Sequence, residues 1–241
     1  MSAPILVAEG ITRRFGQLAA VSDVSFAVAE RTVTSLIGPN GAGKSTIFNL
    51  LTGYVPLTGG RIAFRGTRID GLATHRIARL GVARAFQIAR PFRGLSVRDN
   101  VKVGALYGRD GPRDVAAATE RGLRLAGLEA VAERPAAELT IGQLRRMEVA
   151  RAIAARPDLL LADEPLAGLN PTESDEVLAS LRGLVGEGMT VLLVEHDMPA
   201  VMKVSDRVLV LDAGRLIADG RPEDVTRDPR VIEAYLGAEA P

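Results

Sequence analysis

Residues 38–45 are the most informative cluster, because glycine, lysine and hydroxyl residues stand there at a fixed spacing. The segment Gly-Pro-Asn-Gly-Ala-Gly-Lys-Ser matches the pattern G-x-x-x-x-G-K-[ST] in full. Its glycines let the backbone curl so that several N–H groups point inward, where they can bind phosphate oxygens. Lys44 can reach β- and γ-phosphates, and the Ser45 hydroxyl suits Mg²⁺. A glycine-rich turn that carries a lysine by chance is the alternative, but the full match predicts a nucleoside triphosphate site.

The elements expected around this loop are those that the pattern requires. A buried strand is predicted at 32–37, directly before the loop, and a helix is predicted at 45–51, directly after it. The helix would direct the positive end of its dipole at the same phosphates. The candidate contacts are therefore Gly38, Pro39, Asn40, Gly41, Ala42, Gly43, Lys44, Ser45 and Thr46.

Two adjacent carboxylates form a second candidate cluster. Residues 159–162 are apolar and are followed by Asp163 and Glu164. An isolated pair of this kind is usually a solvated strand end. With the loop 118 residues upstream, we instead expect Asp163 to hold Mg²⁺, directly or through water, and Glu164 to act as general base for the attacking water. Neighbouring side chains on an extended backbone point to opposite faces, which would separate the two roles.

A third cluster is the start of a predicted helix. Thr140 and Gln143 form a T-x-x-Q capping box, and residues 144–156 have apolar positions at helical spacing. Taken alone, this is an ordinary helix start. The functional alternative is that the N-terminus of this helix points at a γ-phosphate held by another subunit.

The rest of the chain predicts an α/β fold. Apolar strands at 159–163 and 190–195 flank a helix pattern at 173–185, and such alternation is typical of a parallel sheet covered on both faces. Short strands are expected near the N-terminus, and residues 90–156 read as mostly helical. The remaining predicted elements are strands at 5–8, 24–28 and 59–66, a hairpin at 207–218 and a short helix at 229–236.

Composition excludes several classes of protein. The 241 residues carry a net charge of only +1, which gives no electrostatic support for nucleic-acid binding. There is no cysteine, so disulfides and cysteine metal sites are excluded. No apolar run approaches the roughly 18–20 residues of a membrane span, and the N-terminus lacks the pattern of a signal peptide. We therefore expect a protein of the cytoplasm, whose membrane role would depend on a partner.

Taken in order, the glycine-rich loop, residues 139–143, residues 161–165 and His196 resemble the ABC ATPase domain over nearly the whole chain. The resemblance implies an α/β P-loop NTPase (RecA-like) core with an antiparallel β subdomain and an α-helical subdomain. It implies a single domain at 4–237. The core with its β subdomain would occupy about 4–88 and 157–237, and the helical subdomain with the signature motif would occupy about 89–156.

The resemblance also implies roles for residues that no spacing argument identifies. Phe15 would stack on adenine, and His196 would contact the γ-phosphate beside the catalytic groups Lys44 and Glu164. Gln87 would contact Mg²⁺ or water and face the membrane partner, so that the metal ligands would be Ser45, Gln87 and Asp163. Thr140, Gly142 and Gln143 would complete the site of a neighbouring subunit. The implied cofactors are ATP and Mg²⁺.

Two positions depart from the family pattern. The usual signature is L-S-G-G-Q, whereas this chain has Thr140 for the serine and Ile141 for the first glycine. The D-loop, residues 167–170, usually ends in aspartate and here ends in Asn170. The hydroxyl and Gly142 are kept. Catalysis is still expected because Lys44, Asp163, Glu164 and His196 are all present, while signalling between the two sites could be altered.

Several local strings resemble the branched-chain amino acid uptake subfamily, and the first ATPase of that system is the nearer match. They lie at 84–87, 90–92, 95–101, 167–171, 194–198 and 228–237. Urea or amide uptake ATPases and the lipopolysaccharide-export ATPase share much of this pattern and stay as alternatives. Non-transport ABC ATPases would need coiled-coil insertions, a basic face or two such domains, and a P-loop kinase or regulator would lack the later motifs.

The implied partners follow from this resemblance. We expect a second ABC ATPase subunit, identical or not, and transmembrane permease subunits whose coupling helix contacts the surface near 87–98. A periplasmic or extracellular solute-binding protein would take part indirectly, and no nucleic acid is expected. The protein would then lie peripherally at the cytoplasmic face of the cell membrane.

Overall fold

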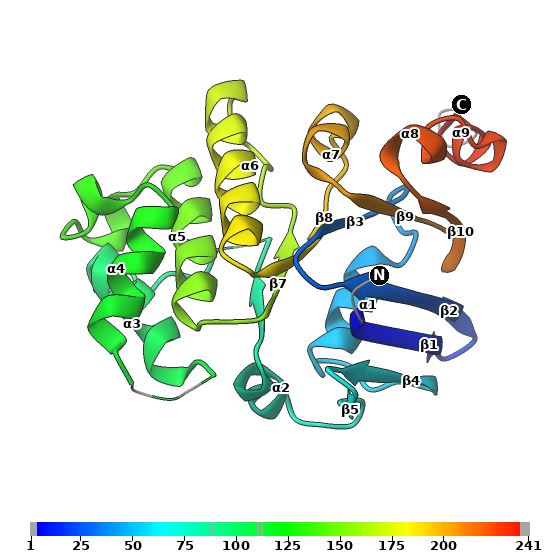
Figure 1. Cartoon of the computed structure of the whole chain (residues 1–241), viewed down its shortest axis with the longest axis horizontal. Helices are drawn as coiled ribbons and strands as arrows, with labels where there is room; N and C mark the ends of the chain where they lie inside the picture. The colour runs from blue at the N-terminus through cyan, green and yellow to red at the C-terminus, as the bar shows by residue number, and fades with distance from the viewer. Residues whose placement is uncertain (1–3, 88, 110, 112, 237–241) are drawn as a thin grey trace. The chain divides into compact units, whose positions relative to one another are not determined.

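The computed structural model describes residues 4–87, 89–109, 111 and 113–236. They divide into two compact units (Figure 1). Unit 1 comprises residues 1–77 and 192–241, and unit 2 comprises residues 78–191. Helix α2 (Thr74–Leu80) and strand β8 (Thr190–Val194) cross the boundaries between them. The predicted domain and subdomain limits stay a prediction.

Unit 1 contains an antiparallel sheet of four strands in the order β2-β1-β4-β5. β1 and β2 form a long hairpin around Gly16, whose φ of 60° suits the turn. Both strands extend well beyond the predicted segments 5–8 and 24–28. Their bounds are β1 (Pro4–Phe15), β2 (Leu18–Ala29), β4 (Gly59–Phe64) and β5 (Thr67–Arg68). The expected antiparallel β region is therefore present.

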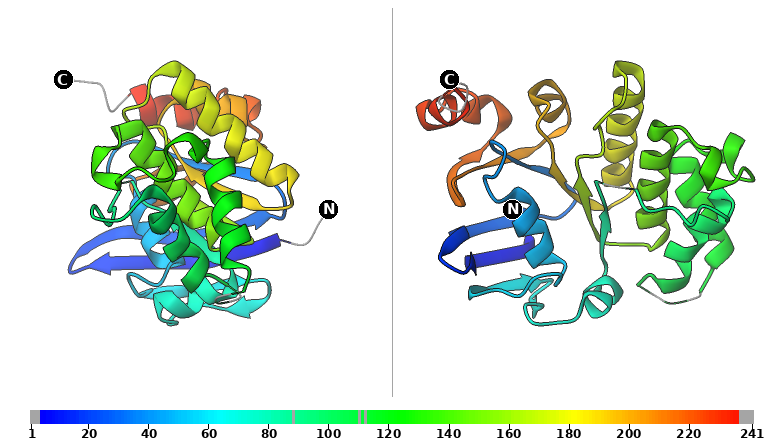
Figure 2. Two further views of the ribbon diagram at one scale, coloured as in Figure 1. Left: turned by 90° about the vertical axis from the view of Figure 1, so that its left-hand side faces the viewer. Right: turned by 180° about the vertical axis from the view of Figure 1, so that it is seen from behind.

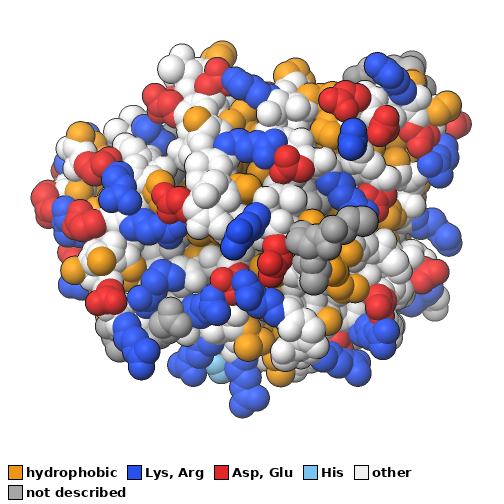
Figure 3. Space-filling model, in the orientation of Figure 1, with side chains coloured by type: hydrophobic (Ala, Val, Ile, Leu, Met, Phe, Trp, Pro, Cys, Tyr) orange, Lys and Arg blue, Asp and Glu red, His pale blue; other side chains and the backbone are white. Residues whose placement is uncertain are grey.

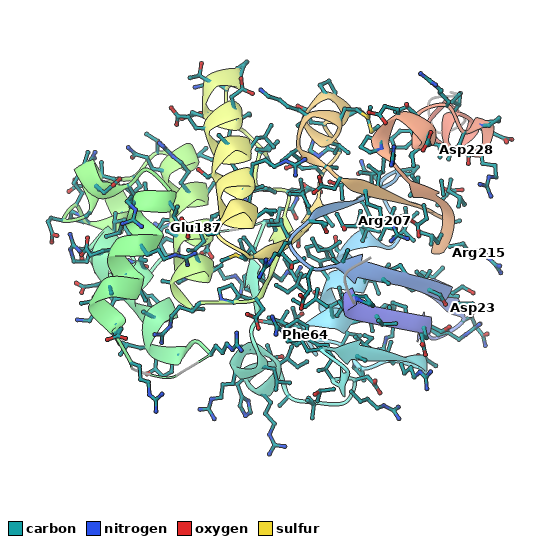
Figure 4. The ribbon with its side chains drawn as sticks, in the orientation of Figure 1. Asp23, Phe64, Glu187, Arg207, Arg215 and Asp228 are labelled. Carbon is teal, nitrogen blue, oxygen red and sulfur yellow. The ribbon has the colours of Figure 1, made fainter. Side chains whose placement is uncertain are left out.

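A second group of strands in unit 1 has the order β10-β9-β3. The next strand in this order is β8, whose residues 192–194 belong to unit 1. β3 runs parallel to β9, whereas β10 is antiparallel to it. Every residue of β3 is buried, including Thr34 and Ser35, as expected for a buried strand. In Figure 4, Arg207 marks the start of β9, where it donates two hydrogen bonds of 2.5 and 2.6 Å to Asp219. The bounds are β3 (Val33–Ile37), β9 (Arg207–Asp212) and β10 (Arg215–Gly220).

The helices of unit 1 follow these strands in sequence, and at least one of them packs on the strands. α1 follows the glycine-rich loop directly, and α9 packs through Val231 on a cluster that includes Ile37 and Val210. The predicted C-terminal helix is thus confirmed with the same bounds. The helices are α1 (Lys44–Leu51), α7 (Met198–Val204), α8 (Pro222–Val225) and α9 (Pro229–Leu236).

Unit 2 combines parallel strands with a helical region. β6 and β7 pair in parallel, with Ala85 opposite Ala162, and β7 is followed in the strand order by β8. α3, α4 and α5 contact one another (Figures 1 and 2) and share a core that includes Val101, Leu123 and Met147. The bounds are β6 (Val82–Ala85), β7 (Leu159–Asp163), α3 (Val97–Tyr107), α4 (Val115–Leu125), α5 (Ile141–Ala154), α6 (Pro171–Gly186), and the 3₁₀ turns η1 (Glu129–Val131) and η2 (Ala136–Glu138).

The helices α3, α4 and α5 approach so closely because glycines stand at their contacts. A Cβ atom on Gly104 would lie 2.0 Å from the Arg151 carbonyl oxygen, and one on Gly122 would lie 2.7 Å from the Ala150 carbonyl oxygen. Both clashes involve the backbone of α5, which cannot rotate away. These glycines therefore set the distance at which α3 and α4 hold the helix that begins at the signature motif.

Candidate functional site

The glycine-rich loop of unit 1 follows β3 and opens α1, as predicted. Gly38, Gly41 and Gly43 have φ angles of 148°, 81° and 105°, a region that L side chains rarely adopt. A Cβ on Gly38 would lie 2.1 Å from the Leu211 carbonyl oxygen, and one on Gly43 would lie 2.6 Å from the Ala20 carbonyl oxygen. The loop shape therefore depends on glycine at these two positions for space as well as for conformation.

Lys44 is held against the loop that precedes it. Its Nζ donates hydrogen bonds of 2.6 Å to the Gly38 carbonyl and 2.9 Å to the Pro39 carbonyl. The side chain is buried, although it carries a charge. The ammonium group is thus fixed beside the loop backbone, which is the position that phosphate binding requires. Ser45 is exposed, and Thr46 is half-buried.

Two further predicted residues belong to unit 1. Phe15 ends β1 with 47% of its surface exposed, and the guanidinium carbon of Arg13 lies 4.5 Å from its ring centroid. The ring is therefore exposed, and the planar guanidinium group of Arg13 lies over it. His196 follows β8, its side chain is 64% exposed, and its Nδ1 lies 3.7 Å from Glu195 Oε2.

The C-terminal helix also reaches the glycine-rich loop. Tyr235 of α9 packs against the cluster that contains Ile37, the last residue of β3. Burial raises the pKa of the Tyr235 phenol, while the nearby Gly38 amide acts in the opposite direction. Helix α9 thus packs next to the start of the glycine-rich loop, a contact that the sequence did not predict.

In unit 2, both candidate carboxylates lie at the end of β7. Asp163 is the last residue of the strand and is buried, with only 5% of its side chain exposed. Glu164 is half-buried and has a φ of 46°. We expected an extended backbone to separate the two side chains. Glu164 instead adopts a left-handed conformation, so a turn after the strand, and not strand alternation, directs its carboxylate.

Each carboxylate has a partner from the neighbouring strand region. Gln87 Nε2 donates a hydrogen bond of 2.5 Å to Glu164 Oε2. Arg84 Nη2 donates a hydrogen bond of 2.5 Å to Asp163 Oδ2 and forms an ion pair with it. The structure thus joins Glu164, proposed from its place after the strand, with Gln87, which the family resemblance implied. Arg84 was missed, because a charged residue signals a buried counter-charge only once the residues around it are recognised as a strand, and β6 was not predicted.

The signature region and the D-loop each begin a helix with a complete capping box. The Gln143 amide donates to Thr140 Oγ1 at 3.2 Å, and the Thr140 amide donates to Gln143 Oε1 at 3.1 Å, as predicted. Asn170 and Glu173 exchange equivalent bonds of 3.0 and 3.1 Å at the start of α6. Asn170 therefore serves as a helix cap, a role that asparagine and aspartate fill equally well.

The two helix starts are also in contact with each other. A Cβ on Gly142 would lie 2.7 Å from Glu173 Oε1, the flexible end of a side chain, so the start of α5 lies close to the first turn of α6. Ile141, by contrast, is 66% exposed. Within unit 2, the substitution of the family glycine by Ile141 thus places an apolar side chain on the surface beside the D-loop.

The donor set is compatible with Mg²⁺ held largely by a substrate. Among the residues that the structure describes, no group of three or more acidic, histidine or cysteine side chains could hold a metal by itself. Mg²⁺ in nucleotide sites typically uses one or two protein oxygens together with phosphates and waters. Asp163 can supply one such oxygen, since Arg84 is bound at Oδ2. Over the same described residues, no helix has the length and hydropathy of a membrane span.

Comparisons with known proteins agree with these features. The sequence profile described as "ABC transporter" matches residues 21–167, and the one described as "Branched-chain amino acid ATP-binding cassette transporter" matches residues 215–241. The chain is 44% identical to the high-affinity branched-chain amino acid transport ATP-binding protein BraF of Pseudomonas aeruginosa, with 98% of this chain and 99% of that protein covered. It is also 44% identical to LivG of Salmonella typhimurium, with the same coverage.

A solved structure extends the agreement to the fold. An ATP-binding cassette of an ABC transporter, in its ADP conformation, superposes with a TM-score of 0.88 at 30% identity, covering 98% of this chain and 100% of that one. The P-loop NTPase fold expected from the motifs is thereby confirmed. The chain belongs to the ABC transporter family, as one of its ATP-binding and ATP-hydrolysing subunits.

Proposed function

We propose that this chain powers an importer of branched-chain or related amino acids. The observation that carries the proposal is the match of residues 215–241 to the branched-chain amino acid cassette profile, at the opposite end of the chain from the general ABC match. Two relatives named for branched-chain amino acid transport cover 98% of the chain at 44% identity. The full-length relatives and the profile that matches residues 215–241 therefore favour the same transport system.

In this proposal, the glycine-rich loop and Lys44 bind the phosphates of ATP. The loop offers its backbone amides, and the ammonium group, fixed by the Gly38 and Pro39 carbonyls, lies at its rim. The exposed ring of Phe15 would stack on adenine, and the exposed His196 would contact the γ-phosphate. Phosphoryl transfer needs little protein chemistry beyond such positioning.

The carboxylate end of β7 would supply the remaining chemistry. Ser45, Gln87 and Asp163 would hold Mg²⁺, which neutralises phosphate charge when bound. Glu164 would take the proton of the attacking water. Its carboxylate is hydrogen-bonded to Gln87 in this structure. Because Gln87 binds only Oε2, the carboxylate would use its remaining lone pairs to accept the proton of the attacking water.

A second ATPase subunit would complete each site. Thr140, Gly142 and Gln143 at the start of α5 would face the γ-phosphate of that neighbour; of the three, Thr140 is exposed, Gln143 is half-buried and Gly142 is buried. Two subunits would then close around two ATP molecules, and hydrolysis would reopen them. Because the side chains of Thr140 and Gln143 cap their own helix, the contribution of this motif would come mainly from a fixed helix N-terminus.

The permease would contact the surface near 87–98. Phe92 and Leu95 are large apolar side chains in this segment, and both are exposed. Asn100, which is fully buried, binds the Phe92 amide at 2.8 Å and the Phe92 and Ser96 carbonyls at 3.1 and 2.9 Å. The loop that presents the apolar side chains is therefore held firmly by α3. Attachment to a permease would place the protein peripherally at the cytoplasmic face of the membrane.

No nucleic-acid role is included in the proposal. Positive and negative side chains are intermingled on the face shown in Figure 3, in line with the net charge of +1. Such a surface lacks the single-sign field that favours nucleic-acid binding.

Isolation of the tagged chain with its membrane partners tests the proposal. We expect multi-span permease subunits to co-purify in detergent. In proteoliposomes with the matching solute-binding protein, leucine, isoleucine or valine should stimulate ATP hydrolysis several-fold. Urea and short amides serve as the comparison. Stimulation by urea or amides alone, or the absence of any membrane partner, would contradict the assignment.

A further inference from the structure

A buried cation lies beside the carboxylate that we assign to the metal ion. Arg84 Nη2 lies 2.5 Å from Asp163 Oδ2, and the two side chains are 8% and 5% exposed. Both residues come from unit 2, on adjacent strands. A charged pair so far removed from water is held firmly, because separating the partners would leave an uncompensated buried charge.

The parallel register explains how the two groups meet. Arg84 stands opposite Leu161, so its long side chain runs along β7 to reach Asp163, two residues further on. The guanidinium carbon also lies 4.8 Å from the centroid of the Phe86 ring. A planar group beside an aromatic ring and hydrogen-bonded to a carboxylate is restricted in both position and orientation. Arg84 therefore restricts the rotation of the Asp163 carboxylate.

A second arginine–aspartate pair stands at the other end of the same strand. Arg109 Nη1 lies 2.5 Å from Asp158 Oδ1, directly before β7, with side chains 38% and 18% exposed. The two pairs share chemistry and distance but differ in burial and in their position relative to the glutamate that follows β7. The Arg109 pair thus shows what an ordinary structural contact of this kind looks like in this unit.

We infer that Arg84 is a positioning residue for the metal ion: it holds Asp163 Oδ2, so that the other carboxylate oxygen is the one presented to the metal and its waters. The inference rests on the proposed function, since it assumes that Asp163 serves Mg²⁺. It also explains why a strand of four residues, otherwise small or apolar, carries an arginine at its third position. Mutation of a residue that hydrogen-bonds a metal ligand without touching the metal typically lowers metal affinity about 10–100-fold.

Binding of Mn²⁺ to the full chain loaded with a non-hydrolysable ATP analogue tests the inference. Electron paramagnetic resonance of free Mn²⁺ gives the dissociation constant without any turnover. We expect Arg84→Met to weaken Mn²⁺ binding about 10–100-fold, with Arg84→Lys intermediate, because lysine keeps the charge but not the planar fork. Affinity for the analogue without metal should stay within about two-fold, since Arg84 is assigned to the metal and not to the nucleotide.

Arg109→Met is the matched control, because it removes the same kind of pair from the distant end of β7. It should leave Mn²⁺ affinity unchanged. Wild-type affinity in Arg84→Met would make the pair merely structural, and tighter binding would make Arg84 a competitor of the metal; either result overturns the inference. Should Arg84→Met fail to fold, Arg84→Lys decides on the same criterion. Absence of Mn²⁺ binding in the wild-type complex would instead contradict the proposed function itself.

Discussion

The glycine-rich loop and the carboxylate end of β7 are built on different principles. The loop is made from one contiguous stretch, and its shape depends on backbone angles and on the room left by absent side chains at Gly38 and Gly43. The carboxylate end is made from side chains whose partners are distant in sequence. Asp163 is 79 residues from Arg84, and Glu164 is 77 residues from Gln87.

This difference predicts which kinds of substitution should damage each region. A loop made of backbone should be sensitive to added volume and should tolerate changes in surface side chains. A cluster made of paired side chains should be sensitive to the loss of a single functional group, even when the volume stays the same. Isosteric and volume-changing substitutions therefore distinguish the two regions.

The largest effect is expected at the carboxylate end, from a change that alters no volume. Glu164→Gln should lower ATP turnover by roughly 10²–10⁴-fold, the range for loss of a general base, because the amide cannot accept the proton of the attacking water. ATP binding should survive, since the glycine-rich loop is untouched. Steady-state hydrolysis, together with binding of a fluorescent ATP analogue, measures both quantities.

The exposed Glu129 offers a control for this change, because Glu129→Gln removes the same charge from the turn η1, at a surface position. Its turnover should stay within about two-fold of wild type, as for most surface substitutions. If Glu164→Gln retained wild-type turnover, the base would have to be another group, and the proposed division of roles between Asp163 and Glu164 would fail.

The next effect is expected in the loop, from an added methyl group. Gly38→Ala places a Cβ 2.1 Å from the Leu211 carbonyl oxygen. Overpacking and the positive φ together should cost about 2–5 kcal/mol of unfolding free energy. Gly41→Ala is the matched control, because Gly41 has a φ of 81° but no atom within 4 Å of its Cβ position. It should cost only about 1–2 kcal/mol.

Denaturant unfolding compares the two variants. The difference between them reports the clash with Leu211 together with the higher cost of the φ of 148° at Gly38. Equal losses in Gly38→Ala and Gly41→Ala would show that conformation alone decides, and the contrast between the two regions would lose its basis.

The same contrast explains how much could be predicted from the sequence. The loop, α1 and the Thr140–Gln143 capping box were predicted because their signals are local, lying within a few residues of each other. The turn at Glu164 was not, since its left-handed φ of 46° occurs at a residue with no preference for it. Arg84 was missed because its partner becomes visible only when β6 pairs with β7.

Several short elements were also missed, since α2, β5, β6, α7 and α8 match none of the predicted segments. α2 and β6 have seven and four residues, too few for apolar periodicity to distinguish a helix or strand from a loop. The residue that positions Asp163 lies in one of them. Short elements between clear motifs are thus where sequence patterns carry the least information and where the carboxylate end obtains its partners.

The smallest effect is expected at Asn170, where the family usually has aspartate. This position tests whether a side chain in unit 2 can stabilise its own helix without a partner distant in sequence. Asn170 caps α6 through a 3.0 Å bond from the Glu173 amide. Asn170→Ala should therefore cost about 0.5–2 kcal/mol of unfolding free energy. Asn170→Asp should stay within about 0.5 kcal/mol of wild type, because both residues cap equally well. Thermal unfolding at matched pH compares the three proteins. A large loss in Asn170→Asp would mean that the neutral amide is needed beside Glu173, so that even this helix start would depend on charge pairing and not on a local cap.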